Sequence, residues 1–528
     1  MDERLFWADR MAKEIINRKK FSYLDKPAPK LKEFVVKTSA SLSGVLHIGR
    51  LSDTIRSETV FRALKDAGVK ARFIWVAEDM DPMRKVPKGI PANYSEYLGM
   101  AVTDIPDPHG CHESYGAHHK DAYIKVLEQF VTSPMEKFSM REEYKKGTFK
   151  PHVKKIMEQF EAVVEIQNRY RSTPVPTDWS PWMPICENCG KVITARVKKV
   201  EDGKVHYRCE DYKFATTIAK GCGHEGVDDP MKCNGKLVWK SEWGSQWAHW
   251  KVVAEGAGRE YQVPMSPWWI NAEICEKIHG FPAPMPIFYG HVMIDGVKMS
   301  ASLGNVIYPK DWLDVAGAEM LRLFFNKRLM KVRSFSFKDL PKLYEDYDMH
   351  ARVFSGKEKM ENKKEAAHLK RLFELSHMGD TEPNPVSFDH AVAISQTAKG
   401  KEAVKEQLEK TGVKPEKPVL QRVERARIWV ERYSQENAIK LLDEPNVSGI
   451  GANGKKALKG LAKLLGKEMN EEALHNAIWD LANSSGMKPG DFFRTVYTAL
   501  LGKPSGPKLA QLVTATGRDK IRKLLEKV

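Results

Sequence analysis

The chain has 528 residues, of which 42% are hydrophobic and 29% are charged, so it can bury large cores and is not a mostly disordered protein. At roughly 150 residues per domain, this length predicts three or four units and excludes a single small binding module. Lys and Arg number 85 against 69 Asp and Glu, and the net charge of +16 makes a polyanion, nucleic acid above all, the expected partner.

The first residues of the chain alternate charged and apolar side chains and therefore predict no secretory signal. No apolar run is long enough to cross a bilayer, so we expect no membrane segment. The chain has 7 cysteines, which are too few for a disulfide framework in a protein of this length. We expect a cytoplasmic protein with reduced thiols.

The first part of the chain alternates short apolar runs with amphipathic stretches. Residues 34–36 and 73–77 are apolar at successive positions, as in strands of a parallel sheet that is covered on both faces. Residues 48–67 between them have helical spacing and stop at Gly68. This order predicts a doubly wound α/β sheet of the nucleotide-binding kind. Three acidic residues after the second strand can be functional groups or a helix cap: Glu78, Asp79 and Asp81.

The composition changes twice along the chain. Residues 183–237 are rich in Cys and Gly, with short strand candidates such as 191–200, and they interrupt the α/β pattern. The alternation returns in residues 238–344, and the rest has helical periodicity with many Lys, Glu, Ala and Leu. We therefore predict an α/β domain in two halves, 1–182 and 238–344, an insertion at 183–237 and an all-helical region at 345–528.

A first motif follows the first strand and ends in His47-Ile48-Gly49-Arg50. It stands where a helix begins, so backbone N–H groups and the helix dipole favour a bound anion there. The small residues Ser43, Gly44 and Gly49 let phosphates approach the backbone closely. His47 can donate a hydrogen bond to a phosphoryl oxygen as negative charge builds up. A serine-rich turn in which His47 only caps the helix explains the same residues.

A second motif, Lys298-Met299-Ser300-Ala301-Ser302, lies far downstream and is followed by Gly304. One lysine among small residues suits a mobile loop that closes over a triphosphate and neutralises the departing pyrophosphate. Taken alone, the motif also fits a surface lysine in solvent.

Together, the His-Ile-Gly turn and the Lys-Met-Ser-x-Ser loop resemble the paired signatures of class I aminoacyl-tRNA synthetases. The resemblance is closest to the class I lysyl-tRNA synthetases, the archaeal and sporadically bacterial type, and spans nearly the whole chain. The segments that carry it are 84–88 (Arg-Lys-Val-Pro-Lys), 97–99 (Tyr-Leu-Gly), 105–108 (Ile-Pro-Asp-Pro), 110–115 (Gly-Cys-His-Glu-Ser-Tyr), 239–247 and 499–507. The last segment is also similar to glutamyl-tRNA synthetases, whose helical anticodon-binding region this family shares.

The resemblance implies that lysine is activated with ATP and Mg²⁺ to lysyl-adenylate and then transferred to the terminal adenosine of tRNA(Lys). Such an in-line displacement at phosphorus needs positioning and charge stabilisation more than covalent help. The implied roles are His47 at the α-phosphate, Gly49 against adenine and Lys298 at the β- and γ-phosphates. The other implied ATP contacts are Ser43, Gly44, Ser300 and Ser302.

A lysine pocket has to satisfy an ammonium group, which calls for a carboxylate or an aromatic face. Glu242, Trp243 and Trp247 can supply these, although two core tryptophans and a surface glutamate explain the same residues. Thr38 and Ser39, at the end of the first strand, are candidates for contacts to the backbone groups of the amino acid.

Among the departures from the family pattern, those of two segments are the most serious. Residues 259–261 are Arg-Glu-Tyr where the family usually carries Lys-Asp-His, and residues 266–269 are Ser-Pro-Trp-Trp where a small-residue turn followed by Tyr-Asp is expected. Because this region is expected to line the site, Glu260 and Tyr261 join the substrate-binding candidates. The departures leave two alternatives, a class I synthetase with altered amino-acid specificity and a noncatalytic tRNA-binding paralogue.

The cysteines of the insertion have the spacing of a four-thiolate structural zinc site. The predicted ligands are Cys186, Cys189, Cys209 and Cys222. His224 or Cys233 can take the place of Cys222 as a ligand. Metal binding can stabilise this insertion by on the order of 10 kcal/mol.

A second group can bind another metal or can be unliganded loop residues: His109, Cys111, His112, His118 and His119. In the helical region, five lysines share helix faces and can contact tRNA phosphates. Lysines that are merely solvated explain this run equally well: Lys455, Lys456, Lys459, Lys463 and Lys467.

Overall fold

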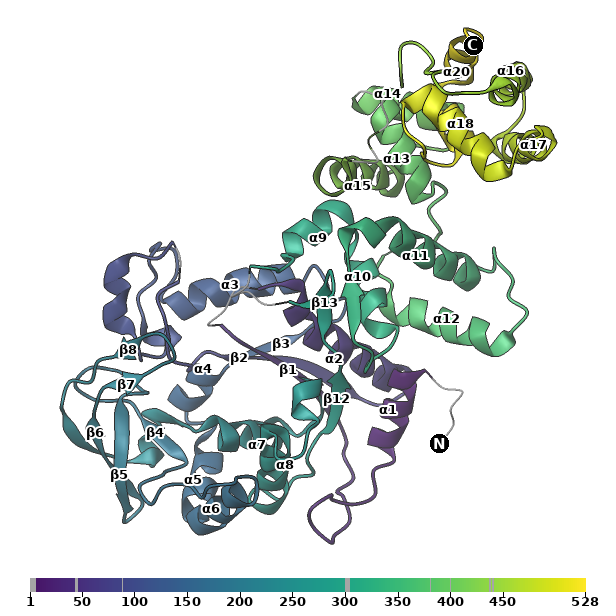
Figure 1. Cartoon of the computed structure of the whole chain (residues 1–528). Helices are drawn as coiled ribbons and strands as arrows, with labels where there is room; N and C mark the ends of the chain where they lie inside the picture. The colour runs from purple at the N-terminus through teal and green to yellow at the C-terminus, as the bar shows by residue number, and fades with distance from the viewer. Residues whose placement is uncertain are drawn as a thin grey trace. The chain divides into compact units, whose positions relative to one another are not determined.

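The computed structural model describes residues 6–42, 46–87, 89–299, 304–379, 381–398, 400–435, 438 and 441–528 (Figure 1). The chain divides into two compact units. The first comprises Met1–Pro309, Leu321–Ser334 and Glu374–Met378, and the second comprises Lys310–Met320, Phe335–Phe373 and Gly379–Val528.

A five-stranded sheet in the order β12-β11-β1-β2-β3 forms the centre of the first unit, and every neighbouring pair is parallel. Its strands are β1 (Phe34–Ser41), β2 (Ala71–Glu78), β3 (Glu136–Ser139), β11 (Val252–Gly258) and β12 (Met285–Tyr289). This confirms the predicted parallel α/β sheet. The strand order reverses at β1, so the crevice beside the carboxyl ends of β1 and β11 is where such a sheet binds ligands.

Helix α2 (Ile48–Asp66) connects β1 to β2 and packs against both strands, as the helical spacing predicts. It is buried on most sides, and its Glu58 forms a fully buried ion pair with Arg322. On another side of the sheet, the strand residues Val35 and Ile74 share a core with tryptophans of α7 (Trp239–Trp250) and α8 (Pro267–Lys277). Cys275 of α8 is a buried apolar residue of this core, as its sequence context indicates.

The insertion is held at its two ends by an antiparallel pair, β4 (Trp182–Pro184) with β10 (Gly235–Leu237). Between them lie a three-stranded antiparallel sheet and a short hairpin. The sheet consists of β5 (Ala195–Glu201), β6 (Lys204–Cys209) and β9 (Glu225–Asp228), and the hairpin consists of β7 (Tyr212–Lys213) and β8 (Ile218–Ala219). Residues 183 and 237, the predicted bounds of the insertion, lie in β4 and β10.

Shorter elements complete the first unit and its connections to the second. The helices are α1 (Trp7–Ile16), α3 (Tyr115–Leu127), α4 (Met140–Lys145), α5 (Lys150–Glu158), α6 (Phe160–Arg169), α9 (Pro309–Val315) and α10 (Ala318–Asn326). The strands β13 (Val292–Ile294), β14 (Val297–Lys298) and β15 (Arg333–Phe335) form a small sheet. The short helical turns are η1 (Ala92–Tyr97), η2 (Val102–Asp104), η3 (Pro230–Lys232), η4 (Arg259–Tyr261) and η6 (Phe337–Asp339).

The described part of residues 345–528 contains helices and no strand, which confirms the predicted all-helical region. Its helices are α11 (Leu340–Ser355), α12 (Lys363–Ser376), α13 (Phe388–Thr397), α14 (Lys401–Lys410), α15 (Lys417–Tyr433), α16 (Ala452–Leu465), α17 (Glu471–Ser484), α18 (Pro489–Leu501), α19 (Leu509–Thr516) and α20 (Arg518–Leu525). Residue 345, the predicted start of this region, lies inside α11. No helix in the described ranges is both long enough and apolar enough to span a membrane.

Candidate active site

An open cavity of about 380 Å³ lies at the carboxyl ends of β1 and β11, where the topology of the sheet places a ligand site. Both sequence motifs border it, although they are far apart along the chain. Of the predicted site residues, those that line the cavity are Ser39, His47, Gly49, Trp243, Glu260, Tyr261 and Lys298.

His47 precedes the first turn of α2 and has an extended backbone. Its Nδ1 is buried and has no hydrogen-bond partner among the described residues. Burial and the nearby Arg50 guanidinium lower the pKa of His47, so the imidazole is neutral near pH 7. The ring lies against Gly49, because a Cβ atom at Gly49 would be only 3.0 Å from its Nδ1. A small residue at position 49 therefore keeps the ring in place at the cavity.

The second motif reaches the same place through a hairpin in which Met293 of β13 pairs with Lys298 of β14. Lys298 is exposed at the cavity, and the next residue, Met299, is buried against the start of α2. The backbone N–H of Ile48 donates to the carbonyl of Ile307 at 2.9 Å. This hydrogen bond joins the first motif to the segment that follows the second motif. Four predicted ATP contacts lie outside the described residues: Ser43, Gly44, Ser300 and Ser302.

The cavity lining includes Glu255, which forms a buried ion pair with Lys37. The Lys37 ammonium lies 2.7 Å from Glu255 Oε1, and both side chains are at most 1% exposed. The other oxygen of Glu255 accepts from Nε1 of Trp243, at 3.0 Å, and from Nε1 of Trp247. Because Glu255 already has a cation and indole donors, it positions the tryptophans and is not available to a substrate ammonium.

Asp53, on the second turn of α2, lines the cavity and is a residue that sequence reasoning missed. Its Oδ2 accepts from the Thr38 hydroxyl at 2.6 Å, whereas Oδ1 is buried and has no partner among the described residues. Burial raises the pKa of Asp53 to about 7. A Cβ atom on Gly256 would lie 1.9 Å from Oδ1, so only glycine fits beside this carboxylate.

Glu78, at the carboxyl end of β2, also lines the cavity. Its Oε2 accepts from the Gln246 amide at 3.0 Å, and its Oε1 is 3.8 Å from the Lys37 ammonium. Burial raises the pKa of Glu78 to about 7, so Lys37 does not fully compensate its charge. The neighbouring Asp79 accepts from the backbone N–H of Arg141 at the start of α4, so it fits the structural alternative.

Aromatic rings also line the cavity. The rings of Trp243 and Tyr261 lie 5.5 Å apart, and the ring of Trp239 lies 6.1 Å from Tyr261. Glu260, the residue before Tyr261, lies 3.5 Å from His291, which also lines the cavity. Aromatic faces and carboxylates together are the surroundings that an ammonium group prefers.

Three predicted substrate-binding residues lie behind the cavity surface. Thr38 donates a hydrogen bond to Asp53, and the fully buried Trp247 donates one to Glu255. Glu242 is buried, accepts from the Tyr144 hydroxyl at 2.6 Å and lies 3.2 Å from Lys236. These residues support the lining and do not form it.

The four predicted zinc ligands of the insertion come together. Sγ of Cys186 is 3.7 Å from Sγ of Cys222, and Sγ of Cys189 is 3.6 Å from Sγ of Cys209. Tetrahedral zinc with bonds of about 2.3 Å places its sulfurs about 3.8 Å apart, whereas disulfide sulfurs are about 2.05 Å apart. The spacing and the donor set therefore fit zinc. The alternative ligands lie elsewhere, since His224 pairs with Glu187 and Cys233 belongs to the main core.

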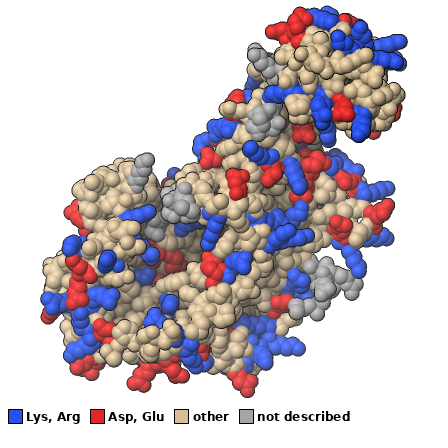
Figure 2. Space-filling view, in the orientation of Figure 1, with Lys and Arg blue, Asp and Glu red and all other residues tan. Residues whose placement is uncertain are grey.

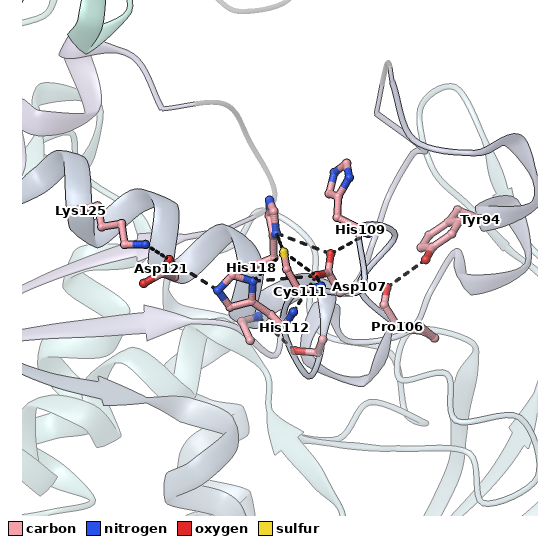
Figure 3. A network of polar contacts seen from close by, with 11 residues as sticks. Tyr94, Pro106, Asp107, His109, Cys111, His112, His118, Asp121 and Lys125 are labelled. Carbon is pink, nitrogen blue, oxygen red and sulfur yellow. Dashed lines mark hydrogen bonds and ion pairs between the residues drawn. The ribbon is translucent and has the colours of Figure 1, made fainter.

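A second potential metal site lies just before α3 (Figure 3). Sγ of Cys111 is 3.2 Å from Asp107 Oδ2, 3.1 Å from His112 Nδ1 and 3.2 Å from His118 Nδ1. One ligand atom from each of these four residues lies within 4.8 Å of the others, which is close enough to share one ion. The mixture of thiol, imidazole and carboxylate suits zinc. His109 and His119 are outside this group of four.

The predicted lysine surface lies in the second unit. Four of its residues are exposed on α16 (Lys455, Lys456, Lys459 and Lys463), and Lys467 is exposed after the helix ends. Blue side chains gather over this end of the chain in Figure 2.

Comparison with known proteins matches both regions of the chain. Residues 5–379 match the family described as tRNA synthetases class I (K), and residues 423–528 match the family described as anticodon binding domain. The lysine–tRNA ligase of Methanosphaera stadtmanae is 29% identical over 97% of each chain. That of Methanocaldococcus jannaschii is 29% identical over 98% of each chain, and that of Pyrococcus furiosus is 31% identical over 97% of this chain and 98% of its own. The chain therefore belongs to the class I tRNA synthetases of the family denoted K, the letter for lysine.

Proposed function

We propose that the chain is a lysine–tRNA ligase, which activates lysine with ATP and transfers it to tRNA(Lys). The observation that supports this most directly is that His47, Lys298 and Asp53 border one cavity. The first two suit a triphosphate and the third suits an ammonium group, so one cavity holds the contacts that both substrates require.

In the activation step, an oxygen of the lysine carboxylate attacks the α-phosphorus, the bond to the bridging oxygen breaks, and pyrophosphate leaves. The neutral His47 donates a hydrogen bond to an α-phosphoryl oxygen as charge develops there. Gly49 leaves room for the nucleotide at the start of α2, and Lys298 neutralises the β- and γ-phosphates. When bound with ATP, Mg²⁺ supplies further positive charge to the phosphates.

Free lysine carries two ammonium groups, and the cavity offers two carboxylates whose charge is not fully compensated, Asp53 and Glu78. A buried carboxylate without a full partner binds an incoming cation favourably, because the cation removes the penalty of burying its charge. Trp243 and Tyr261 add an aromatic face for the same cation. Ser39, at the end of β1, is placed to contact the backbone groups of the amino acid.

Zinc has a structural role in this proposal. The four cysteines of the insertion hold one ion, which fixes a module whose own apolar cluster is small. The group of Asp107, Cys111, His112 and His118 holds a second ion and fixes the loop that leads into α3.

For tRNA, we assign anticodon binding to residues 345–528 and phosphate contacts to the lysines of α16. The net charge of +16 favours such a partner. We assign catalysis to the two halves of the α/β domain, residues 1–182 and 238–344. We assign the protein to the cytoplasm.

Pyrophosphate exchange into ATP, measured with each of the common amino acids in turn, tests the activity. We expect exchange with lysine, and its loss in Lys298→Ala with unchanged tRNA affinity, whereas a control at an exposed lysine of α2, Lys65→Ala, keeps it. Exchange with another amino acid alone would establish altered specificity. Absence of exchange with every amino acid, together with tRNA binding, would establish the noncatalytic paralogue.

A further inference from the structure

Lys236 is a buried cation where the insertion meets the catalytic domain. It is the middle residue of β10, the strand of the insertion that pairs with β4, and it is only 5% exposed. Its ammonium lies 3.2 Å from Glu242 Oε2 of α7 and 3.4 Å from Oδ1 of Asp81, which belongs to the loop after β2. Lys236 therefore joins the insertion to α7 and to that loop.

A hydrogen-bond network surrounds this ammonium. The backbone N–H of Leu237, the next residue, donates to the Tyr144 hydroxyl at 2.9 Å, and this hydroxyl donates to Glu242 Oε1 at 2.6 Å. Each oxygen of Glu242 thus has a donor, one from Tyr144 and the other from Lys236. Burial lowers the pKa of Lys236, but the neighbouring carboxylates outweigh this effect and raise it, so the ammonium stays charged. A buried charge in such a network is held in one position.

Both partners of Lys236 belong to segments that position Glu78, the cavity carboxylate at the end of β2. Asp81 follows Glu78 by three residues in the chain. Glu242 precedes Gln246 by about one turn of α7, so the two side chains share a face of the helix. The Gln246 amide donates to Glu78 Oε2 at 3.0 Å. Lys236 thereby holds α7 and the loop after β2 on either side of Glu78.

Lys236 also acts on Glu78 through its charge. The charged groups that face Glu78 are Lys37 of β1, Lys236 of β10 and Glu242 of α7. Burial is the largest influence and, together with Glu242, raises the pKa of Glu78 to about 7, whereas the two lysines lower it. Without Lys236 the pKa of Glu78 would be higher still, and less of its carboxylate would be ionised at neutral pH.

We propose that Lys236 is a positioning residue for lysine recognition, which acts on the substrate ammonium through Glu78. This inference deepens the proposed function and rests on it, because it needs a lysine ammonium at Glu78. Lys236 is not among the described residues that line the cavity, so it does not itself contact the substrate. The insertion then contributes to amino-acid binding through β10, although its other strands lie away from the cavity lining.

Lys236→Gln tests the proposal in the full-length protein, because it removes the charge but keeps an N–H donor for Glu242. Pyrophosphate exchange at varied lysine measures the effect at two pH values. The KM for lysine should be about fivefold higher than in the unaltered protein at pH 7 and about equal to it at pH 9, where Glu78 is ionised in both. The kcat and the KM for ATP should stay within about twofold, which also reports an intact fold.

Lys236→Arg is the second variant and retains the cation. Its KM for lysine should stay within about threefold of the unaltered protein at both pH values, since only the shape of the cation changes. Lys232→Gln is the matched control, because it makes the same change at an exposed lysine of the insertion, and it should behave like the unaltered protein.

A double variant tests the route through Glu78. Lys236→Gln combined with Glu78→Gln should have the same KM for lysine as Glu78→Gln alone, because Lys236 acts through that carboxylate. A residue that only supports the fold would instead add its own loss in both backgrounds.

The proposal is overturned if Lys236→Gln leaves the KM for lysine unchanged at pH 7, or raises it equally at pH 7 and pH 9. It is also overturned if Lys236→Arg loses as much as Lys236→Gln, or if Lys236→Gln fails to fold, since those outcomes assign the side chain to packing. Failure of the proposed function is distinguishable, because the unaltered protein would then lack lysine-dependent exchange.

Discussion

A Cβ atom placed on Gly49 would lie 3.6 Å from Cε of Met299 and 3.0 Å from the His47 ring. The first motif, which opens α2, is thus in contact with the second motif, which follows β14. His47 and Lys298 consequently face one cavity and can act on the two ends of one triphosphate.

The contact at Gly49 predicts that Gly49→Ala lowers pyrophosphate exchange, because the added methyl group pushes the His47 ring out of place. We expect a loss of roughly 10-fold to 100-fold, and a loss of roughly 100-fold to 1000-fold for His47→Ala, which removes the donor itself. The double variant should be no slower than His47→Ala alone, since both changes act through one imidazole. Normal exchange in Gly49→Ala would contradict the assigned role of His47.

Asp53→Asn should raise the KM for lysine by roughly 10-fold to 100-fold, because a neutral amide cannot compensate an ammonium charge. The KM for ATP should change little. Steady-state exchange at varied lysine and fixed ATP measures the effect. Serine at position 52, the preceding residue, also lines the cavity and provides a control, since Ser52→Ala removes a hydroxyl but no charge. Equal KM values for lysine in Asp53→Asn and the unaltered protein would exclude Asp53 from lysine recognition.

The same variant should change how stability depends on pH. Burial raises the pKa of Asp53 from 3.8 to about 7, so the folded protein holds a proton there that the unfolded chain has released. The contribution of Asp53 to the free energy of unfolding therefore falls as pH rises from about 4 to about 7. In thermal melts without lysine, Asp53→Asn should be more stable than the unaltered protein at pH 8. This advantage should be smaller at pH 5. A difference that is the same at both pH values would be inconsistent with the raised pKa.

Metal analysis of the purified protein should find about two zinc ions per chain, one for each group of ligands. Cys209→Ser and Cys111→Ala should each retain about one, because each removes a ligand from a different group. Cys275→Ala is the matched control, since Cys275 is buried in α8 away from both groups, and it should retain both ions. Zinc retained in full by either ligand variant would show that its group does not bind the ion.

Several features of the fold could be predicted because they are local in the sequence. Successive apolar residues mark β1 and β2, the helical spacing between them marks α2, and the spacing of Cys186 and Cys189 indicates a metal ligand pair. The pairing of β11 with β1, and of β12 with β11, joins segments far apart in the sequence and is specified by no local pattern.

The role of Asp53 was missed for the same reason. An acidic residue two turns into a helix usually faces solvent, and its burial depends on Gly256, which follows much later in the sequence. Trp247 is an example of the opposite case. Its residue type suits a ligand, but its indole N–H donates a hydrogen bond to Glu255 instead. Residue type indicates the chemistry, but only packing decides which of these groups reaches the cavity.

The most direct measurement is a crystal structure of the protein with lysine and an ATP analogue that cannot be cleaved between its α- and β-phosphates. The α-phosphate should lie within about 3.2 Å of the His47 ring, the distal phosphates within about 4 Å of the Lys298 ammonium, and a lysine ammonium against Asp53. A nucleotide bound outside this cavity, or one that touches a single motif while the other faces solvent, would contradict the account.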